Sequence, residues 1–155
     1  MSETVKKQIQ ALIDQEALGL NSKNPDLFLD FIHPDMVWPW PPTPHDHDPV
    51  QWRFVLGRFN KDRWRQHFRA IFDHYDLVHN DRSTVKFEVS PEEDAAFAIL
   101  DIDLLWRDKD TKQEIEWKGR VSKFYTRMTG GDWKFIFQTG PLDYAGGDSL
   151  KCYPP

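Results

Sequence analysis

Residues 31–52 have the sequence FIHPDMVWPWPPTPHDHDPVQW and hold three of the chain's seven Trp and three of its six His. Large aromatic side chains beside prolines with fixed φ angles favour a rigid, partly buried wall over a solvated linker. The stretch also divides the chain, because helical patterns flank it and strand patterns follow. We therefore predict that it forms one wall and the rim of a pocket.

Three helices are expected around this stretch. In the first, apolar residues recur at helical spacing at Val5, Ile9, Leu12, Ile13, Ala17 and Leu20. Asn24 and Pro25 supply an N-cap and a first-turn proline for a short second helix that ends before Pro34. Asn60 begins a third helix, whose apolar face is Trp64, Phe68, Ile71 and Phe72.

The second half of the chain has the alternation of β-strands. A short edge strand is expected at residues 36–40, because Pro39 cannot donate to a sheet. A strand ending at Val89 has Val85, Phe87 and Val89 on one face, and further strands are predicted over 95–106, 113–128 and 133–139. This order predicts an α+β fold in which a curved, mixed or antiparallel sheet packs on three N-terminal helices. Residues 1–141 would form this domain and residues 142–155 a C-terminal tail.

Composition narrows the function classes. The 155 residues suit one domain, and the 25 acidic and 20 basic residues alternate rather than forming blocks. This pattern argues against nucleic acid or a membrane as partner. A single cysteine, Cys152, excludes an intrachain disulfide and a cysteine metal site, so cytoplasm is the simplest expected location. No signal peptide or membrane-spanning stretch is predicted.

Two aspartates interrupt the apolar strand predicted over residues 95–106. Asp101 and Asp103 lie in its middle and share a face. A carboxylate there is costly unless it is paired or in contact with water. With Arg120 they are the predicted catalytic residues, and a salt-bridged network, exposed or against a partner subunit, is the alternative.

The order of elements from Val5 to Pro141 resembles that of the nuclear transport factor two-like superfamily. Two segments carry the likeness: residues 26–38, DLFLDFIHPDMVW, where a small helix leads into a strand, and GRVSKFY with GDWKFIFQTGP at 119–125 and 131–141. SnoaL-like polyketide cyclases, ketosteroid isomerases and the association domain of calcium/calmodulin-dependent kinase share this cone-shaped fold. The second segment is similar to the closing hairpin of the SnoaL-like and kinase-association branches.

The resemblance implies a pocket inside the cone. By their positions relative to the family, the residues that line this pocket would be Trp38, Trp40, Asp101 or Asp103, Arg120 and Gln138. In the kinase-association branch the positions resembling Arg120 and Gln138, and one near Asp101, are arginines that face the cavity. An Arg120–Asp101 pair would therefore make this pocket nearly neutral. Trp40 stands where ketosteroid isomerases carry their proton-transferring aspartate, which argues against that chemical route.

A metal site is the alternative use of the loop at residues 45–48. His45 and His47 alternate with Asp46 and Asp48, and these side chains are ligands for zinc and other divalent metals, with His33 as a candidate third ligand. The other interpretation is a polar loop at the pocket mouth. Because His-x-His without a confirmed third ligand is weak evidence, neither a metal nor a cofactor is predicted.

These observations predict a protein that binds a small, largely apolar ligand. The expected ligand contacts are Trp38, Trp40, Trp52 and Gln138, and isomerase, lyase or cyclase chemistry on a small apolar substrate would be compatible with them. The alternative is a non-catalytic oligomerisation domain with a vestigial pocket. A homodimer is expected in either case.

Overall fold

The computed structural model describes residues 3–44, 46 and 48–139. Its elements run in the order α1 (Glu3–Asn21), α2 (Asp26–Leu29), β1 (Ile32–Val37), the 3-10 helix η1 (Pro49–Gln51), α3 (Lys61–His74), β2 (Tyr75–Val89), β3 (Ala95–Asp108), β4 (Glu114–Arg127) and β5 (Trp133–Gln138). The predicted α+β class is confirmed. The predicted tail at 142–155, with Cys152, lies outside the described residues. None of the described helices is long and apolar enough to cross a bilayer.

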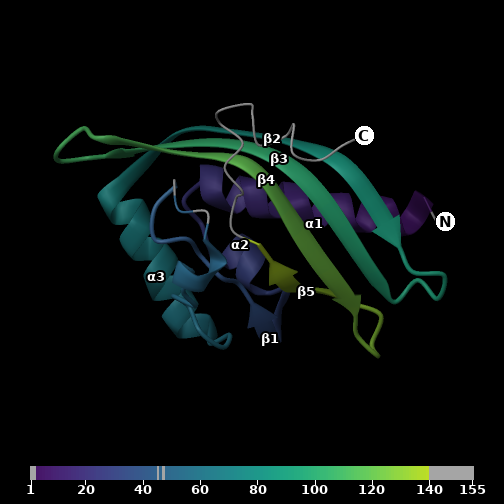
Figure 1. The fold of residues 1–155 in the computed structure, drawn as a ribbon. Helices are drawn as coiled ribbons and strands as arrows, with labels where there is room; N and C mark the ends of the chain where they lie inside the picture. Colours follow the sequence, from purple (N-terminus) through teal and green to yellow (C-terminus); the bar gives the residue numbers. More distant parts are fainter. Residues whose placement is uncertain (1–2, 45, 47, 140–155) are drawn as a thin grey trace.

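The five strands form one mixed, open sheet in the order β1-β5-β4-β3-β2. β1 pairs with β5 in parallel, and all other neighbours are antiparallel. In Figure 1 the long strands β2, β3 and β4 arch over α1, while α3 lies below one end of the arch and β1 and β5 below its middle. In β4, Gly119 has φ of +146°, a conformation that favours glycine and marks a bend in the strand.

The sheet has an inner face, which packs on the helices, and an outer face. On β3 the predicted alternation is confirmed, because the inner-face residues Ala96, Ala98, Leu100, Ile102 and Leu104 are all buried. The helices cover this face with Ile9 and Ile13 of α1 and with Trp64 of α3, which is 0% exposed. Burial of this apolar surface is the main stabilising contribution to the fold.

Local signals set the ends of α3. The side chain of Asn60 accepts a hydrogen bond from the backbone N–H of Arg63 at 3.0 Å, so the predicted N-cap is present. The helix ends at His74 and β2 begins at the next residue. Phe68 and Phe72 are buried, as their spacing predicted.

Two β-bulges interrupt β2 where it pairs with β3, at Leu77/His79 and at Thr84/Lys86. The bulges leave Val78 and Val85 42% and 50% exposed. The expectation that Val85 shares a face with Phe87 and Val89 was wrong, because the extra residue in a bulge shifts the alternation by one.

The segment between the bulges turns polar side chains inward. Asn80, Arg82 and Thr84 pair with Leu104, Ile102 and Leu100, which are inner-face residues of β3. Residues directly opposite in an antiparallel pair share a face of the sheet. The bulges thus bring Arg82 under the sheet.

The first strand begins and ends earlier than predicted. β1 covers Ile32–Val37 rather than 36–40, and Pro34 lies inside it. A proline is tolerated there because β1 is an edge strand with only β5 as neighbour. Trp40 makes an isolated antiparallel bridge with Arg53, which closes the loop between them.

Candidate functional site

The predicted catalytic residues lie on the outer face of the sheet, not inside the cone. Asp101 and Asp103 alternate with the buried Leu100 and Ile102 of β3, and Arg120 stands directly opposite Asp101 on β4. Because side chains alternate between the faces of a sheet, all three point away from the helices. The expectation that they line the cone was therefore wrong in placement.

These three residues take part in ion pairs. Arg120 donates two hydrogen bonds to Asp101, from Nε to Oδ1 at 2.7 Å and from Nη2 to Oδ2 at 3.0 Å. Asp103 lies 2.8 Å from His79 Nε2 and 3.0 Å from Lys118 Nζ. Hydrogen bonds from His79 and Lys118 lower the pKa of Asp103 below its usual value.

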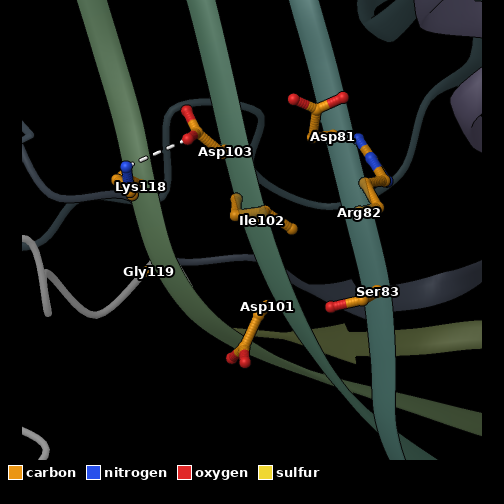
Figure 2. A pocket seen from close by; sticks show the side chains of 8 residues that line it. All are labelled: Asp81, Arg82, Ser83, Asp101, Ile102, Asp103, Lys118 and Gly119. Carbon is orange, nitrogen blue, oxygen red and sulfur yellow. Dashed lines mark ion pairs between the residues drawn. The ribbon is translucent and has the colours of Figure 1, made fainter.

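A hollow of about 380 Å³ opens among these residues, with Asp81, Ser83, Asp101, Asp103 and Lys118 in its lining. Figure 2 shows Asp101 and Asp103 projecting from β3 and Lys118 reaching toward Asp103. The hollow lies on the outer face, so the helices do not close over it. Its wall combines charged and hydroxyl side chains with apolar surface, Ile102 included.

The predicted ligand-binding tryptophans occupy two places. Trp38 is buried and stacks on Trp40 at a centroid distance of 5.3 Å, and Trp40 meets the edge of Trp117 at 5.5 Å. Trp52 lies in the loop after β1, where its Nε1 donates to the carbonyl oxygen of Asp46 at 3.4 Å. The structure thus groups Trp38 with Trp40 and leaves Trp52 apart.

Gln138 is the one predicted site residue that contacts a buried charge. Its Oε1 accepts a hydrogen bond from Lys123 Nζ, and Gln138 is 6% and Lys123 1% exposed. Lys123 also donates to Glu16 Oε2 of α1 at 2.7 Å. Its Nζ lies 4.6 Å from the centroid of the Phe135 ring.

A second cation shares the Glu16 carboxylate. Arg82 Nη1 lies 3.6 Å from Glu16 Oε2, and its Nε donates to Asn80 Oδ1 at 2.8 Å. One carboxylate thus serves the two cations Arg82 and Lys123. We call Glu16, Arg82, Lys123, Tyr125 and Gln138 the inner polar cluster.

The charges perturb one another because water is excluded. Burial, together with the repulsion from Arg82, lowers the pKa of Lys123 to about 8. Burial alone would raise the pKa of Glu16, but Lys123 and Arg82 bring it below its usual value. Burial and the nearby Glu16 carboxylate raise the pKa of Tyr125 well above its usual value.

Two buried donors next to this region have no hydrogen-bond partner among the described residues. They are the Tyr125 hydroxyl and Trp38 Nε1. Tyr125 is 2% exposed and stacks on Phe135 at 5.2 Å, and Phe135 also packs against Trp38 at 6.1 Å. Buried polar atoms without partners are rare in proteins and call for an explanation.

A groove of about 310 Å³ between α1 and β2 shares one residue, Arg82, with the cluster. Its lining includes Gln10 and Ile13 from α1, Arg82 and Thr84 from β2, and Leu100 from β3. The Thr84 hydroxyl donates to Gln10 Oε1 at 2.9 Å. Arg82 belongs to both the groove and the inner polar cluster, so it connects the two.

The loop at residues 45–48, the candidate metal site, is described at Asp46 and Asp48. His45 and His47 lie outside the described residues, so the proposed use of that loop as a metal site stays untested. Within the described part of the chain, no group of three or more His, Cys, Asp or Glu side chains is placed to hold a metal ion. His33 Nδ1 accepts a hydrogen bond from the backbone N–H of Asp35 at 2.9 Å.

No protein-family model matches the chain, and no curated protein matches it in sequence. Solved structures do match its fold. An NTF2-like superfamily protein from Salmonella enterica is similar with a TM-score of 0.65 and 15% identity, over 92% of this chain and 95% of the other. This chain has the NTF2-like fold. The resemblance found in the sequence is therefore confirmed at the level of fold.

Two further structures show the range of proteins that share the NTF2-like fold. A ketosteroid isomerase-like protein from Erwinia carotovora atroseptica has a TM-score of 0.64 and 14% identity, over 90% of this chain and 95% of that one. A type 2 hexachlorocyclohexane dehydrochlorinase has a TM-score of 0.65 and 15% identity, over 91% and 86%. At such identities, these NTF2-like neighbours establish architecture and not activity.

Two positions in the sequence indicate the inner polar cluster, although neither was among the predicted site residues. Glu16 lies three residues after Ile13 and four before Leu20, on the apolar stripe of the first helix. Lys123 lies between Val121 and Tyr125 in the inner row of β4, where it is the charged residue between Ile115 and Tyr125. A charged residue at an apolar position on each of two elements is a pattern typical of a buried pair.

Proposed function

We propose that the protein binds a small molecule beneath the inner face of the sheet, at the inner polar cluster. The observation that carries the proposal is the Tyr125 hydroxyl, which is buried near the charges of Glu16 and Arg82 without a hydrogen-bond partner among the described residues. A ligand oxygen would supply that partner. Trp38 and Trp40 would form the apolar wall of the same site, and Gln138 would hold Lys123 in place.

The cost of the cluster supports a functional role. Two cations and a carboxylate under a sheet lose their hydration, and a buried ion pair rarely stabilises a fold more than apolar side chains of similar size would. Strongly shifted pKa values in such clusters are common at functional sites. Lys123, Glu16 and Tyr125 therefore support binding or chemistry better than they support stability.

The chemistry that fits best is that of an isomerase or a lyase. Such reactions often begin with removal of a proton from carbon, which requires a base with a pKa near the working pH. The amine of Lys123, with a pKa of about 8, meets this requirement. The isomerase-like and dehydrochlorinase neighbours have names in keeping with this class. We also propose that the protein acts in the cytoplasm, as its sequence predicted.

Thermal shift measurements with small ketones and the matching alcohols test this function. Cyclohexanone, acetophenone and their alcohols would raise the melting temperature of the wild-type protein. Tyr125→Phe would remove most of the shift, because the unpartnered hydroxyl is lost while the ring that packs on Phe135 stays. Lys86→Met, at an exposed residue paired with Glu88, is the matched control and would keep the full shift. An unchanged melting temperature with every compound would contradict the proposal.

The outer face supports a second candidate, assembly of two copies of the chain. Phe124 is 39% exposed on this face, stacks on Phe97 at 5.5 Å and meets the edge of Phe137 at 5.4 Å. A partly exposed aromatic row beside the Arg120–Asp101 and Lys118–Asp103 pairs has the mixed apolar and charged composition of a protein interface. In this role Asp101, Asp103 and Arg120 would be contact residues and not catalytic ones.

A further inference from the structure

Lys123 has an environment that surface lysines lack. Its ammonium group is 1% exposed and contacts Glu16, Gln138 and the ring of Phe135. The charged and polar groups around it come from three other elements: Glu16 from α1, Arg82 from β2 and Gln138 from β5. Tyr125 is the next inner-face residue of β4 itself. Since Arg82 competes for the same carboxylate, the positive charge on Lys123 is only partly compensated.

This environment makes Lys123 a nucleophile near neutral pH. With a pKa of about 8, about half of the Lys123 side chains are neutral amines at pH 8. A lysine with the usual pKa of 10.4 is less than about 1% neutral at that pH. Desolvation next to another cationic group is an established way to activate a lysine amine for attack on carbonyl compounds.

We propose that Lys123 binds an aldehyde or a ketone covalently, as an imine, at the inner polar cluster. The inference rests on the proposed function and deepens it, because it names the class of ligand and the atom that reacts. The cluster supplies two groups that imine formation needs: an amine and, 2.7 Å from it, a carboxylate to move protons.

The reaction balances without an oxidant or a reductant. The neutral Lys123 Nζ adds to the carbonyl carbon, an N–C bond forms, and the electrons of the C=O π bond move to the oxygen. Glu16, 2.7 Å from Nζ, takes a proton from the nitrogen and returns it to that oxygen. The C–O bond then breaks, and water leaves with the second amine proton.

The strand next to Lys123 on one side, β3, carries two alanines on its inner face. Ala98 stands directly opposite Lys123 on β3, and Ala96 stands opposite Tyr125. Leu100, the next inner-face residue after Ala98, also lines the groove between α1 and β2. A carbonyl compound of a few heavy atoms therefore fits this path better than a large one.

Reductive trapping tests the inference directly. The wild-type protein is incubated at pH 7 with propionaldehyde and cyanoborohydride, which reduces an imine to a stable secondary amine. Peptide mass mapping then locates the added propyl groups. We expect Lys123 to be labelled roughly ten times faster than the exposed Lys86, even though Lys86 is far easier to reach. Lys123→Arg keeps the positive charge and would remove this label alone.

The pH profile separates an activated lysine from ordinary ones. Labelling of Lys123 would rise between pH 6 and pH 8 and then level off, whereas labelling of Lys86 would keep rising above pH 8. Labelling at surface lysines with Lys123 unmodified would overturn the inference. If cyclohexanone still raises the melting temperature in that case, binding stands and only the imine fails. If, in addition, none of the ketones or alcohols raises the melting temperature of the wild-type protein, the proposed function is overturned too.

Discussion

At the scale of single residues, Lys123 and Arg82 share the carboxylate of Glu16. The effect of this arrangement on the free energy of unfolding depends on pH. In the folded protein Lys123 has a pKa of about 8, and in the unfolded chain a lysine has a value near 10.4. Between these values the unfolded state binds more protons than the folded state. Stability attributable to Lys123 therefore rises with pH across that window.

Replacing Lys123 by Met would remove this pH dependence. We expect the difference in unfolding free energy, wild type minus variant, to increase by up to about 3 kcal/mol between pH 8 and pH 10.4. Urea denaturation at several pH values measures it, with Lys86→Met as the control for loss of a lysine. A difference that stays constant across this range would show that Lys123 has an ordinary pKa in the folded protein.

Single residues also show how far the sequence could predict the site. Asp101 and Asp103 were chosen because acidic residues in an apolar strand are unusual, but alternation alone does not reveal which face is buried. Leu100 and Ile102, which alternate with these aspartates along β3, occupy the inner face. Asp101 and Asp103 therefore lie on the outer face. Arg82 could not have been found from periodicity, because its inward position depends on two bulges that have no glycine or proline to mark them.

At the scale of elements, the contact between α1 and α2 depends on a glycine. A Cβ at Gly19 would lie 2.5 Å from Phe28 Cδ1 and 2.9 Å from the Asn24 carbonyl oxygen. Phe28 is 2% exposed and packs edge-on against Phe68 at 4.9 Å, so its ring has little room to move. Gly19 thus allows the close approach of α1 and α2.

Gly19→Ala is expected to destabilise the protein despite the better helix propensity of alanine. The steric clash costs about 1 to 3 kcal/mol, against a gain of about 1 kcal/mol from propensity. Gly130→Ala is the matched control, because a Cβ there meets nothing within 4 Å. Thermal unfolding compares the two variants. A Gly19→Ala protein that melts at or above the wild-type temperature would contradict the close packing.

The helices were easier to predict than the strands, for a physical reason. Asn60 as N-cap and Trp64 with Phe68 on one face are local signals, and the structure confirms them. The position of β1 depends instead on its pairing with a partner about 100 residues later in the chain. Local sequence placed that strand four residues too late because Pro34 was taken as a break.

At the scale of the whole molecule, the proposed dimer would form through the outer face of the sheet. If two copies pack through this face, the row formed by Phe97, Phe124 and Phe137 becomes the centre of the interface. Central aromatic residues contribute most of the binding energy in such contacts. The ion pairs around them would then set the orientation of the two copies.

Phe124→Asp would weaken such a dimer by at least roughly tenfold in its dissociation constant, since the change costs more than about 1.4 kcal/mol. Light scattering coupled to size exclusion measures the mass over a range of concentrations. Val50→Asp is the control, because Val50 is 83% exposed and lies in η1, outside the strands of the sheet. A wild-type protein that is monomeric at high concentration would rule out the assembly role.

The parallel pairing of β1 with β5 also affects how the chain is made. Ile32 pairs with Phe135, and the Phe135 N–H donates to the Phe31 carbonyl oxygen at 2.7 Å. A ribosome adds about 5 to 20 residues per second, so β1 waits roughly 5 to 20 s for β5, its partner among the described strands. During that time Ile32 and Met36, both buried in the finished fold, remain exposed on an unpaired segment. Synthesis therefore includes a period in which this segment is open to chaperones or to the same strand of a neighbouring nascent chain.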